Sequence, residues 1–101
     1  MCYIFMYNMH NLIGFQRDLL RVINGLNEPT DTNIKNSMED YYGKDIDLGR
    51  IRINIDVIVK YDYIEKEIQR DKRYTHRYLI TNKGKNALKK RDEWVNEQTN
   101  N

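Results

Sequence analysis

Residues 47–80 read DLGRIRINIDVIVKYDYIEKEIQRDKRYTHRYLI, and the fold of the whole chain can be worked out from them. The first part follows a helical period, because apolar side chains three or four residues apart form one stripe: Leu48, Ile51, Ile55 and Ile58. Asp47 is a good N-cap for this helix. The many β-branched residues also suit a strand, but the polar residues do not alternate, so we expect a helix.

The second part of these residues changes its period to two. In residues 64–68 one face carries Ile64, Lys66 and Ile68, and the other face is acidic. In residues 74–80 every second residue is Tyr, His, Tyr or Ile, and the polar residues 69–73 lie between the two segments. This pattern predicts a β-hairpin with a basic tip. A last helix is expected to begin directly after the hairpin, at the suitable N-cap Thr81.

Upstream of residue 47, apolar spacing predicts two more helices. The first begins near Phe15 and ends before Pro29, because the residue that precedes a proline disfavours the helical region. The second has its N-cap at either Thr30 or Asp31. It ends at Gly43, which can adopt the positive φ of a helix terminus.

The order helix, helix, helix, hairpin, helix predicts an α+β fold that is mainly α, the winged helix-turn-helix. The chain has 101 residues and makes one domain, expected over residues 13–96. Residues 1–12 are predicted to be a flexible N-terminal extension, and residues 97–101 a frayed tail. Two interpretations of residues 1–8 stay open: an upstream extension set by the choice of start codon, or a segment that packs on a dimer.

The charge distribution says more than the net charge of +2. Nine basic residues fall between residues 69 and 91, where Asp71 is the only acid: Arg70, Lys72, Arg73, Arg77, Lys83, Lys85, Lys89, Lys90 and Arg91. Such an asymmetry predicts a surface that faces phosphate. A solvated helix face is the alternative explanation.

The third helix is the expected reader of DNA. A helix fits the major groove, where its polar side chains reach base edges. Arg50, Arg52 and Asn54 are the polar residues of its first two turns. Arginine pairs with guanine and asparagine with adenine, so we predict that these three residues read bases. The alternative is that they are ordinary surface residues.

Six further residues are predicted to contact the DNA backbone: Thr32, Asn33, Lys35, Arg70, Lys72 and Arg73. The last three lie at the hairpin tip, where basic charge adds affinity with little specificity. The first three lie at the start of the second helix, whose amides can hold a phosphate. Plain capping is an equal alternative there, since Asp31 would repel a phosphate.

Several short segments carry a family resemblance: GFQRDLL at 14–20, INGL at 23–26, Ile34-Lys35, Tyr41-Tyr42, Gly49-Arg50, Asp71-Lys72-Arg73, Leu79-Ile80-Thr81 with Gly84, and Arg91-Asp92-Glu93-Trp94. Together they resemble archaeal PadR-like regulators over about Met9 to Trp94. The resemblance implies a winged-helix homodimer that binds operator DNA, usually as a repressor. It also implies a dimer interface built by the first and last helices, at Phe15, Leu19, Leu88, Trp94 and Val95.

The sequence departs from that family in two places. Members usually carry Leu-Tyr-Pro after the Gly-Arg pair, whereas Ile51-Arg52-Ile53 stands here, so the operator cannot be carried over from relatives. The hairpin is also about one residue longer between Asp71 and Gly84 than the family pattern has it, which leaves the wing contacts open.

Enzyme chemistry has no support in the sequence. Cys2 is the only cysteine, which excludes an internal disulfide and a cysteine-based zinc site. Neither His10 nor His76 has a partner pattern, and no phosphate-binding glycine loop occurs. We therefore expect no enzyme activity, no cofactor and no metal. The first fifteen residues match neither a signal peptide nor a membrane span, and we expect a cytoplasmic protein.

The sequence as a whole predicts a sequence-specific DNA-binding transcription regulator, a homodimeric repressor on a near-palindromic operator in double-stranded DNA. The alternatives are a winged-helix protein-interaction module and a nonspecific architectural DNA binder. The eight tyrosines leave room for a small aromatic effector, although core and edge packing is the commoner role of tyrosine.

Overall fold

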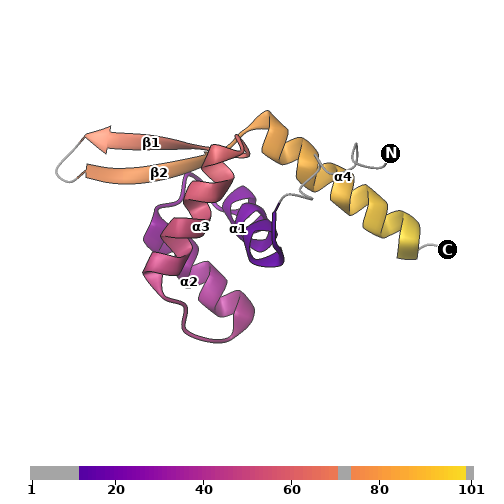
Figure 1. Ribbon diagram of the computed structural model, residues 1–101, viewed down its shortest axis with the longest axis horizontal. Helices are drawn as coiled ribbons and strands as arrows, with labels where there is room; N and C mark the ends of the chain where they lie inside the picture. The colour runs from indigo at the N-terminus through magenta and orange to yellow at the C-terminus, as the bar shows by residue number, and fades with distance from the viewer. Residues whose placement is uncertain (1–11, 71–73, 100–101) are drawn as a thin grey trace.

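A computed structural model of the chain describes residues 12–70 and 74–99. The elements follow the expected order: α1 (Gly14–Gly25), α2 (Asp31–Tyr42), α3 (Leu48–Lys60), β1 (Ile64–Arg70), β2 (Tyr74–Ile80) and α4 (Asn82–Thr99). Helices α1, α2 and α3 form the body, while the hairpin and α4 extend from it in opposite directions (Figure 1). The predicted mainly α winged-helix fold is confirmed.

The core lies between the three helices of the body. Each helix contributes its apolar stripe, and the side chains that are fully buried include Leu19, Ile23, Ile34, Met38, Ile51, Ile55 and Ile58. Leu12 also packs into this core with 2% of its surface exposed. Leu12, the last residue of the expected N-terminal extension, therefore adds apolar surface to the core next to α1.

Local capping sets the helix boundaries. Thr30, one of the two candidates, is the N-cap of α2: its Oγ1 accepts the Asn33 amide at 3.2 Å, and Asn33 Oδ1 accepts the Thr30 amide at 3.0 Å. Asp47 caps α3 by accepting the Arg50 amide at 3.2 Å. Gly43 ends α2 with a φ of 71°, as predicted.

A Schellman motif ends α3 and turns the chain into the hairpin. The Tyr63 amide donates to the Ile58 carbonyl at 3.0 Å, and the Asp62 amide donates to the Val59 carbonyl at 2.9 Å. Asp62 holds the left-handed position of this motif, with a φ of 66°. An aspartate therefore occupies a position that favours glycine.

The hairpin pairs in register from Ile64 opposite Ile80 to Arg70 opposite Tyr74. Its base is joined to the body, because the Tyr78 amide donates to the Pro29 carbonyl at 3.0 Å. Tyr78 is buried, and this burial is the main cause that raises the pKa of its hydroxyl. The predicted tip residues Lys72 and Arg73 lie outside the described residues.

Helix α4 begins where the hairpin ends. Thr81 Oγ1 accepts the Gly84 amide at 3.0 Å, which confirms Thr81 as the N-cap. A Cβ atom at Gly84 would lie 2.3 Å from the Tyr63 carbonyl oxygen, so only glycine allows this close approach. The helix continues to Thr99, past the predicted domain end at residue 96.

Candidate nucleic-acid interface

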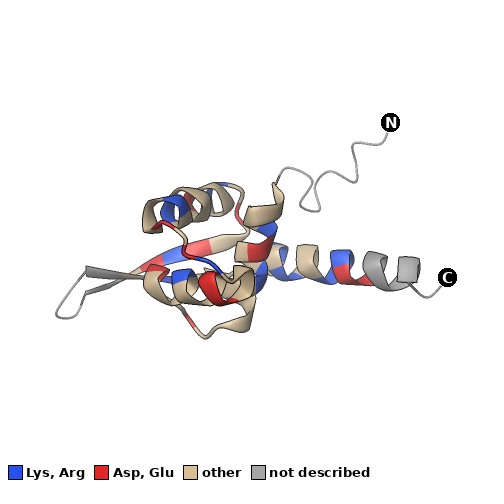
Figure 2. Cartoon of the chain, turned by 90° about the horizontal axis from the view of Figure 1, so that it is seen from below, with Lys and Arg blue, Asp and Glu red and all other residues tan. Residues whose placement is uncertain are grey.

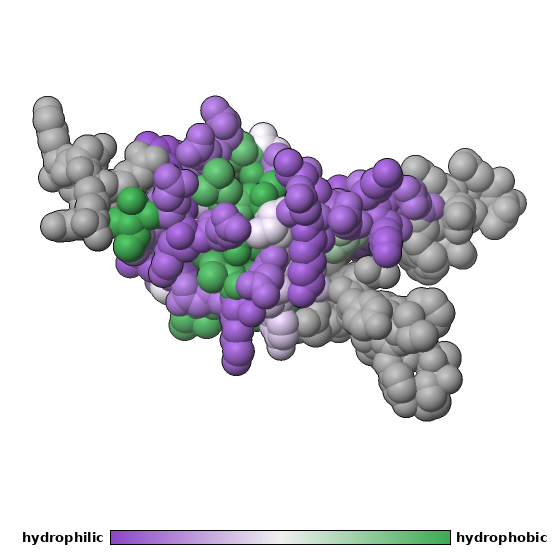
Figure 3. Space-filling model, turned by 90° about the horizontal axis from the view of Figure 1, so that it is seen from above, coloured by the Kyte–Doolittle hydropathy of each residue, from purple (hydrophilic) through white to green (hydrophobic). Residues whose placement is uncertain are grey.

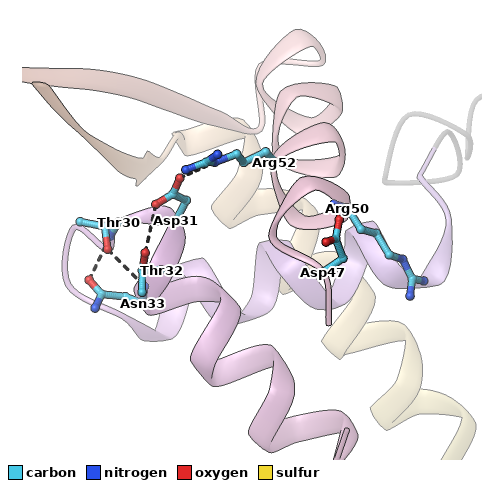
Figure 4. Close-up of polar contacts among 7 residues, drawn as sticks. All are labelled: Thr30, Asp31, Thr32, Asn33, Asp47, Arg50 and Arg52. Carbon is cyan, nitrogen blue, oxygen red and sulfur yellow. Dashed lines mark hydrogen bonds and ion pairs between the residues drawn. The ribbon is translucent and has the colours of Figure 1, made fainter. Parts of the chain in front are cut away.

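Helix α3 presents one face to solvent, opposite its buried isoleucines. With 3.6 residues per turn, Gly49, Ile53, Asp56 and Lys60 share this face, and all four are exposed. We call these four residues the outward face of α3. Arg52 and Arg50 lie on its two flanks, and Figure 4 shows their side chains pointing to opposite sides of the helix.

The Arg52 flank faces the start of α2. Arg52 Nε donates to Asp31 Oδ2 at 2.8 Å, and the side chains are 59% and 21% exposed (Figure 4). This hydrogen-bonded ion pair raises the pKa of the Arg52 guanidinium. The guanidinium keeps unused donors, because it has five N–H groups and one of them serves this bond. Arg52 can therefore still reach a base or a phosphate, but next to a carboxylate.

The Arg50 flank faces the start of α1. The Arg50 guanidinium carbon lies 4.1 Å from the centre of the Phe15 ring, within the range of a cation–π contact. Phe15 in turn stacks on Tyr42 with 5.8 Å between ring centres. Burial and a hydrogen bond to Asp18 raise the pKa of Tyr42 to about 12. Arg50 itself stays exposed and free to approach a ligand from this platform.

Asn54, the third predicted base reader, joins two helices instead of facing outward. Its Nδ2 donates to the Arg50 carbonyl at 2.8 Å, and its Oδ1 accepts Gln16 Nε2 at 2.8 Å. Gln16 is 8% exposed, and its Oε1 accepts the Ile13 amide at 3.2 Å. Reading adenine would require both ends of the Asn54 amide. The structure thus gives Asn54 a role in holding α1 to α3.

The start of α2 is occupied by its own cap. Asn33 uses its side-chain oxygen for the capping box, and the Thr32 hydroxyl donates to Asp31 Oδ1 at 3.5 Å, although Thr32 and Asn33 are both exposed (Figure 4). Lys35 pairs with Glu39 at 2.9 Å, and the same Glu39 oxygen accepts the Ile46 amide at 2.9 Å. The Ile46 hydrogen bond, followed by the Lys35 hydrogen bond, lowers the pKa of Glu39. Lys35 therefore helps to hold the turn between α2 and α3.

The described residues of the basic run 69–91 lie on two parts of the chain. The Arg70 backbone belongs to β1 and Arg77 to β2, whereas Lys72 and Arg73 fall outside the described residues. The other part lies on α4, along which Lys and Arg recur (Figure 2). On the face that Figure 3 shows, the described part of α4 is mostly hydrophilic. The two parts form one run in the sequence because β2 ends at Ile80 and α4 begins at Asn82.

Three of the five predicted dimer residues lie in the core of the single chain. Leu19, Leu88 and Phe15 are 0%, 4% and 8% exposed, which leaves little of their surface for a partner. Their apolar spacing is explained by packing within the chain, of α1 against α2 and α3, and of α4 against the body. Trp94 and Val95 belong to α4 by their backbone, and their side chains are not among those that the structure describes.

Sequence patterns did not single out two residues at this interface. Ile53 is 67% exposed on the outward face, and helical spacing from the buried isoleucines was a signal that could have found it. Gln16 has no such signal, because its role depends on Asn54, which lies 38 residues away.

Other kinds of site find no support in the part of the chain that the structure describes. No group of three or more His, Cys, Asp or Glu side chains there could hold a metal ion. No helix among residues 12–70 and 74–99 is long and apolar enough to cross a membrane.

Solved structures of winged-helix regulators resemble this chain. RosR of H. salinarum superposes with a TM-score of 0.80 at 32% identity, over 89% of this chain and 79% of RosR. A complex named hsRosR-S1 gives 0.81 and 32%, over 90% and 79%. Staphylococcus aureus MarR with salicylate and kanamycin gives 0.65 at 19% identity, over 95% and 65%, and this likeness concerns the fold alone. No protein-family model and no curated protein matches the sequence.

These likenesses are coarser than the resemblance that the sequence carried. The RosR structures point to a winged-helix transcription regulator, whereas the MarR structure supports the fold alone. They do not single out the PadR-like branch, which stays a prediction.

Proposed function

Because this chain belongs to the winged-helix regulators that include RosR, we propose that it is a sequence-specific DNA-binding transcription regulator, working as a homodimeric repressor on a near-palindromic operator. The observation that carries the proposal is the outward face of α3. Within the described residues nothing covers this face, and two arginines, Arg50 and Arg52, flank it.

We propose that the outward face of α3 enters the major groove of DNA. In a helix-turn-helix the second helix of the pair enters the major groove with its N-terminal half toward the bases. Here α3 is that helix, and its first turns carry Arg50, Arg52 and Ile53. The hairpin extends to one side of α3, where Lys66 is exposed and where Arg70, Lys72 and Arg73 are proposed to follow the phosphates.

Helix α4 suits dimerisation. Its first turns bury Gly84, Ala87 and Leu88 against the body, while the rest of the helix extends away from it (Figure 1). Trp94 and Val95 continue the apolar spacing of Ala87 and Leu88 along the sequence. We propose that these two residues pack against a second copy, which would place two α3 helices one helical turn of DNA apart.

The test is a selection from a random duplex library, followed by fluorescence anisotropy on the selected and the scrambled duplex across a salt series. A specific regulator binds the selected duplex about a thousandfold or more tighter than the scrambled one. Equal binding to both duplexes, lost as salt rises, would leave a nonspecific architectural binder. Binding to neither, even at low salt, would favour a protein-interaction module.

Alanine at Arg50 and Arg73 separates the two proposed kinds of contact. Arg50→Ala should relax the base preference of the selected duplex, since its side chain lies on the major-groove helix. Arg73→Ala should weaken binding to every sequence and reduce the slope of log K against log salt by about one.

A small aromatic effector is a second, compatible proposal. The MarR complex contains salicylate. Here the rings of Phe15, Tyr42 and Tyr41 adjoin one another, with 5.2 Å between the centres of the two tyrosines, and Tyr41 is 65% exposed. A rise in Tm with added salicylate that Tyr41→Ala abolishes would support an effector at this cluster. An unchanged Tm would reject it.

A further inference from the structure

Ile53 is an apolar side chain at the centre of a surface proposed to meet DNA. It is 67% exposed, and it lies on the outward face between Gly49 and Asp56. A single exposed isoleucine needs no explanation in general. At this position, however, a β-branched residue lowers helix propensity relative to alanine, and most of its surface stays exposed.

The polar side chains beside Ile53 are wholly or partly engaged within the chain. Asn54 uses both ends of its amide, and Arg52 donates to Asp31. The centre of the outward face therefore offers carbon atoms where sequence patterns led us to expect hydrogen-bonding groups.

The next residue on this face, Asp56, limits what the face can contact. Its exposed carboxylate would be repelled by phosphates. A carboxylate can instead accept a hydrogen bond from a cytosine amino group in the major groove. The pair Ile53 and Asp56 thus fits base edges better than the DNA backbone.

The major groove presents one apolar group among its donors and acceptors, the C5 methyl group of thymine. We propose that Ile53 is a specificity-determining residue that selects thymine by burying this methyl group. The inference rests on the proposed function, since it names which base the outward face of α3 selects.

The experiment uses the duplex selected by the 101-residue chain. Each thymine is replaced singly by deoxyuridine, which lacks only the C5 methyl group, and Kd is measured by anisotropy. We expect one position in each half-site where deoxyuridine weakens binding about fourfold, the effect of one buried methyl group. Ile53→Ala should bind the thymine and deoxyuridine duplexes equally.

A matched variant controls for nonspecific effects. Ile13→Ala removes the same atoms from a residue that is 60% exposed at the start of α1 instead of on α3, and it should keep the fourfold discrimination. Circular dichroism confirms that both variants fold.

Failure of this inference is distinguishable from failure of the proposed function. If the selection yields no preferred duplex, both fall. If a duplex is selected but every deoxyuridine is tolerated, or if Ile53→Ala discriminates as well as the parent, DNA binding stands and the thymine assignment is overturned.

Discussion

The ion pair between Arg52 and Asp31 limits what the arginine can do at a DNA surface. Asp31 lies in the first turn of α2, where the helix dipole also stabilises a carboxylate. Its charge offsets that of Arg52 at the edge of the outward face of α3. Arg52 is 59% exposed and Asp31 is 21% exposed, so solvent screens the pair in part and its contribution to folding is modest. Its main consequence is expected in binding, where Asp31 reduces attraction to any phosphate.

Asp31→Asn tests this view. Removing the carboxylate should tighten binding to scrambled DNA about fivefold at low salt, the equivalent of about 1 kcal/mol. The slope of log K against log salt should steepen by about one for each freed arginine that takes up a phosphate. Anisotropy across a salt series measures both quantities.

Asp92→Asn is the matched control for that variant. Asp92 pairs with Arg21 at 2.8 Å between α4 and α1, so its loss also frees one arginine, but away from α3. It should leave DNA affinity within about twofold. Equal gains in the two variants would mean that only net charge matters, and that the Arg52 pair has no special role.

At the scale of the elements, the junction between the hairpin and α4 is closely packed around Gly84. At Gly84 an added Cβ would meet the Tyr63 carbonyl oxygen at 2.3 Å and Ile80 Cγ1 at 2.7 Å. The first of these is backbone held by the Thr81 amide at 3.0 Å, so it cannot move without opening the junction. A glycine in the first turn of a helix looks unfavourable in the sequence, but this packing requires it.

Gly84→Ala should therefore destabilise the chain by about 1–2 kcal/mol, even after the helix propensity gained with alanine. Thermal unfolding should show Tm lowered by roughly 5–15 °C. Gly25→Ala is the control, because a Cβ added at this position near the end of α1 would meet no atom within 4 Å, and its Tm should stay or rise. An unchanged Tm for Gly84→Ala would show that the junction is looser than its geometry indicates.

At the end of α3, a substitution is expected to stabilise the chain. Asp62 holds a φ of 66° in the Schellman motif, where glycine avoids the steric cost of a side chain. Asp62→Gly should raise the free energy of unfolding by about 0.5 kcal/mol, after the extra freedom of the unfolded chain is counted. Asp40→Gly, at an exposed position within α2, should lower it by a similar amount. Urea unfolding distinguishes the two signs.

At the scale of the whole molecule, the body and α4 have different proposed roles, DNA contact and dimerisation. The body presents α3, whereas α4 extends from it with its last turns away from the three-helix core (Figure 1). A chain of this size buries a modest share of its surface, and a second copy is a natural source of further core. In the proposed homodimer, DNA recognition would depend on α4 indirectly, because α4 would set the distance between two α3 helices.

Trp94→Glu tests this arrangement. A charged residue in an apolar helix interface should shift the chain from dimer to monomer in sedimentation velocity. Because a monomer engages one half-site, the affinity for the selected duplex should fall by tenfold or more. Asn86→Glu introduces the same charge at an exposed position of α4 and should remain dimeric. A Trp94→Glu chain that stays dimeric would place the interface elsewhere.

Local patterns in the sequence were sufficient to predict the elements and their order. Periods of 3.6 and 2 in the apolar residues, with N-cap candidates at Thr30 or Asp31, at Asp47 and at Thr81, indicated three helices, a hairpin and a fourth helix. These signals are local, since a cap bonds an amide three residues away and a helical face repeats within one turn. Interactions between residues that are close in the sequence can therefore be predicted from the sequence alone.

How the candidate residues are used depends instead on the packing of the helices. Asn54 bonds to Gln16 and Arg52 to Asp31, and the partners of these bonds lie on different helices, 38 and 21 residues apart in the chain. The same packing put Leu19 in the core and left Ile53 outside. Contacts between distant segments form only when the helices pack. The spacing of residues within one helix does not indicate which side chain of a neighbouring helix each of them will contact.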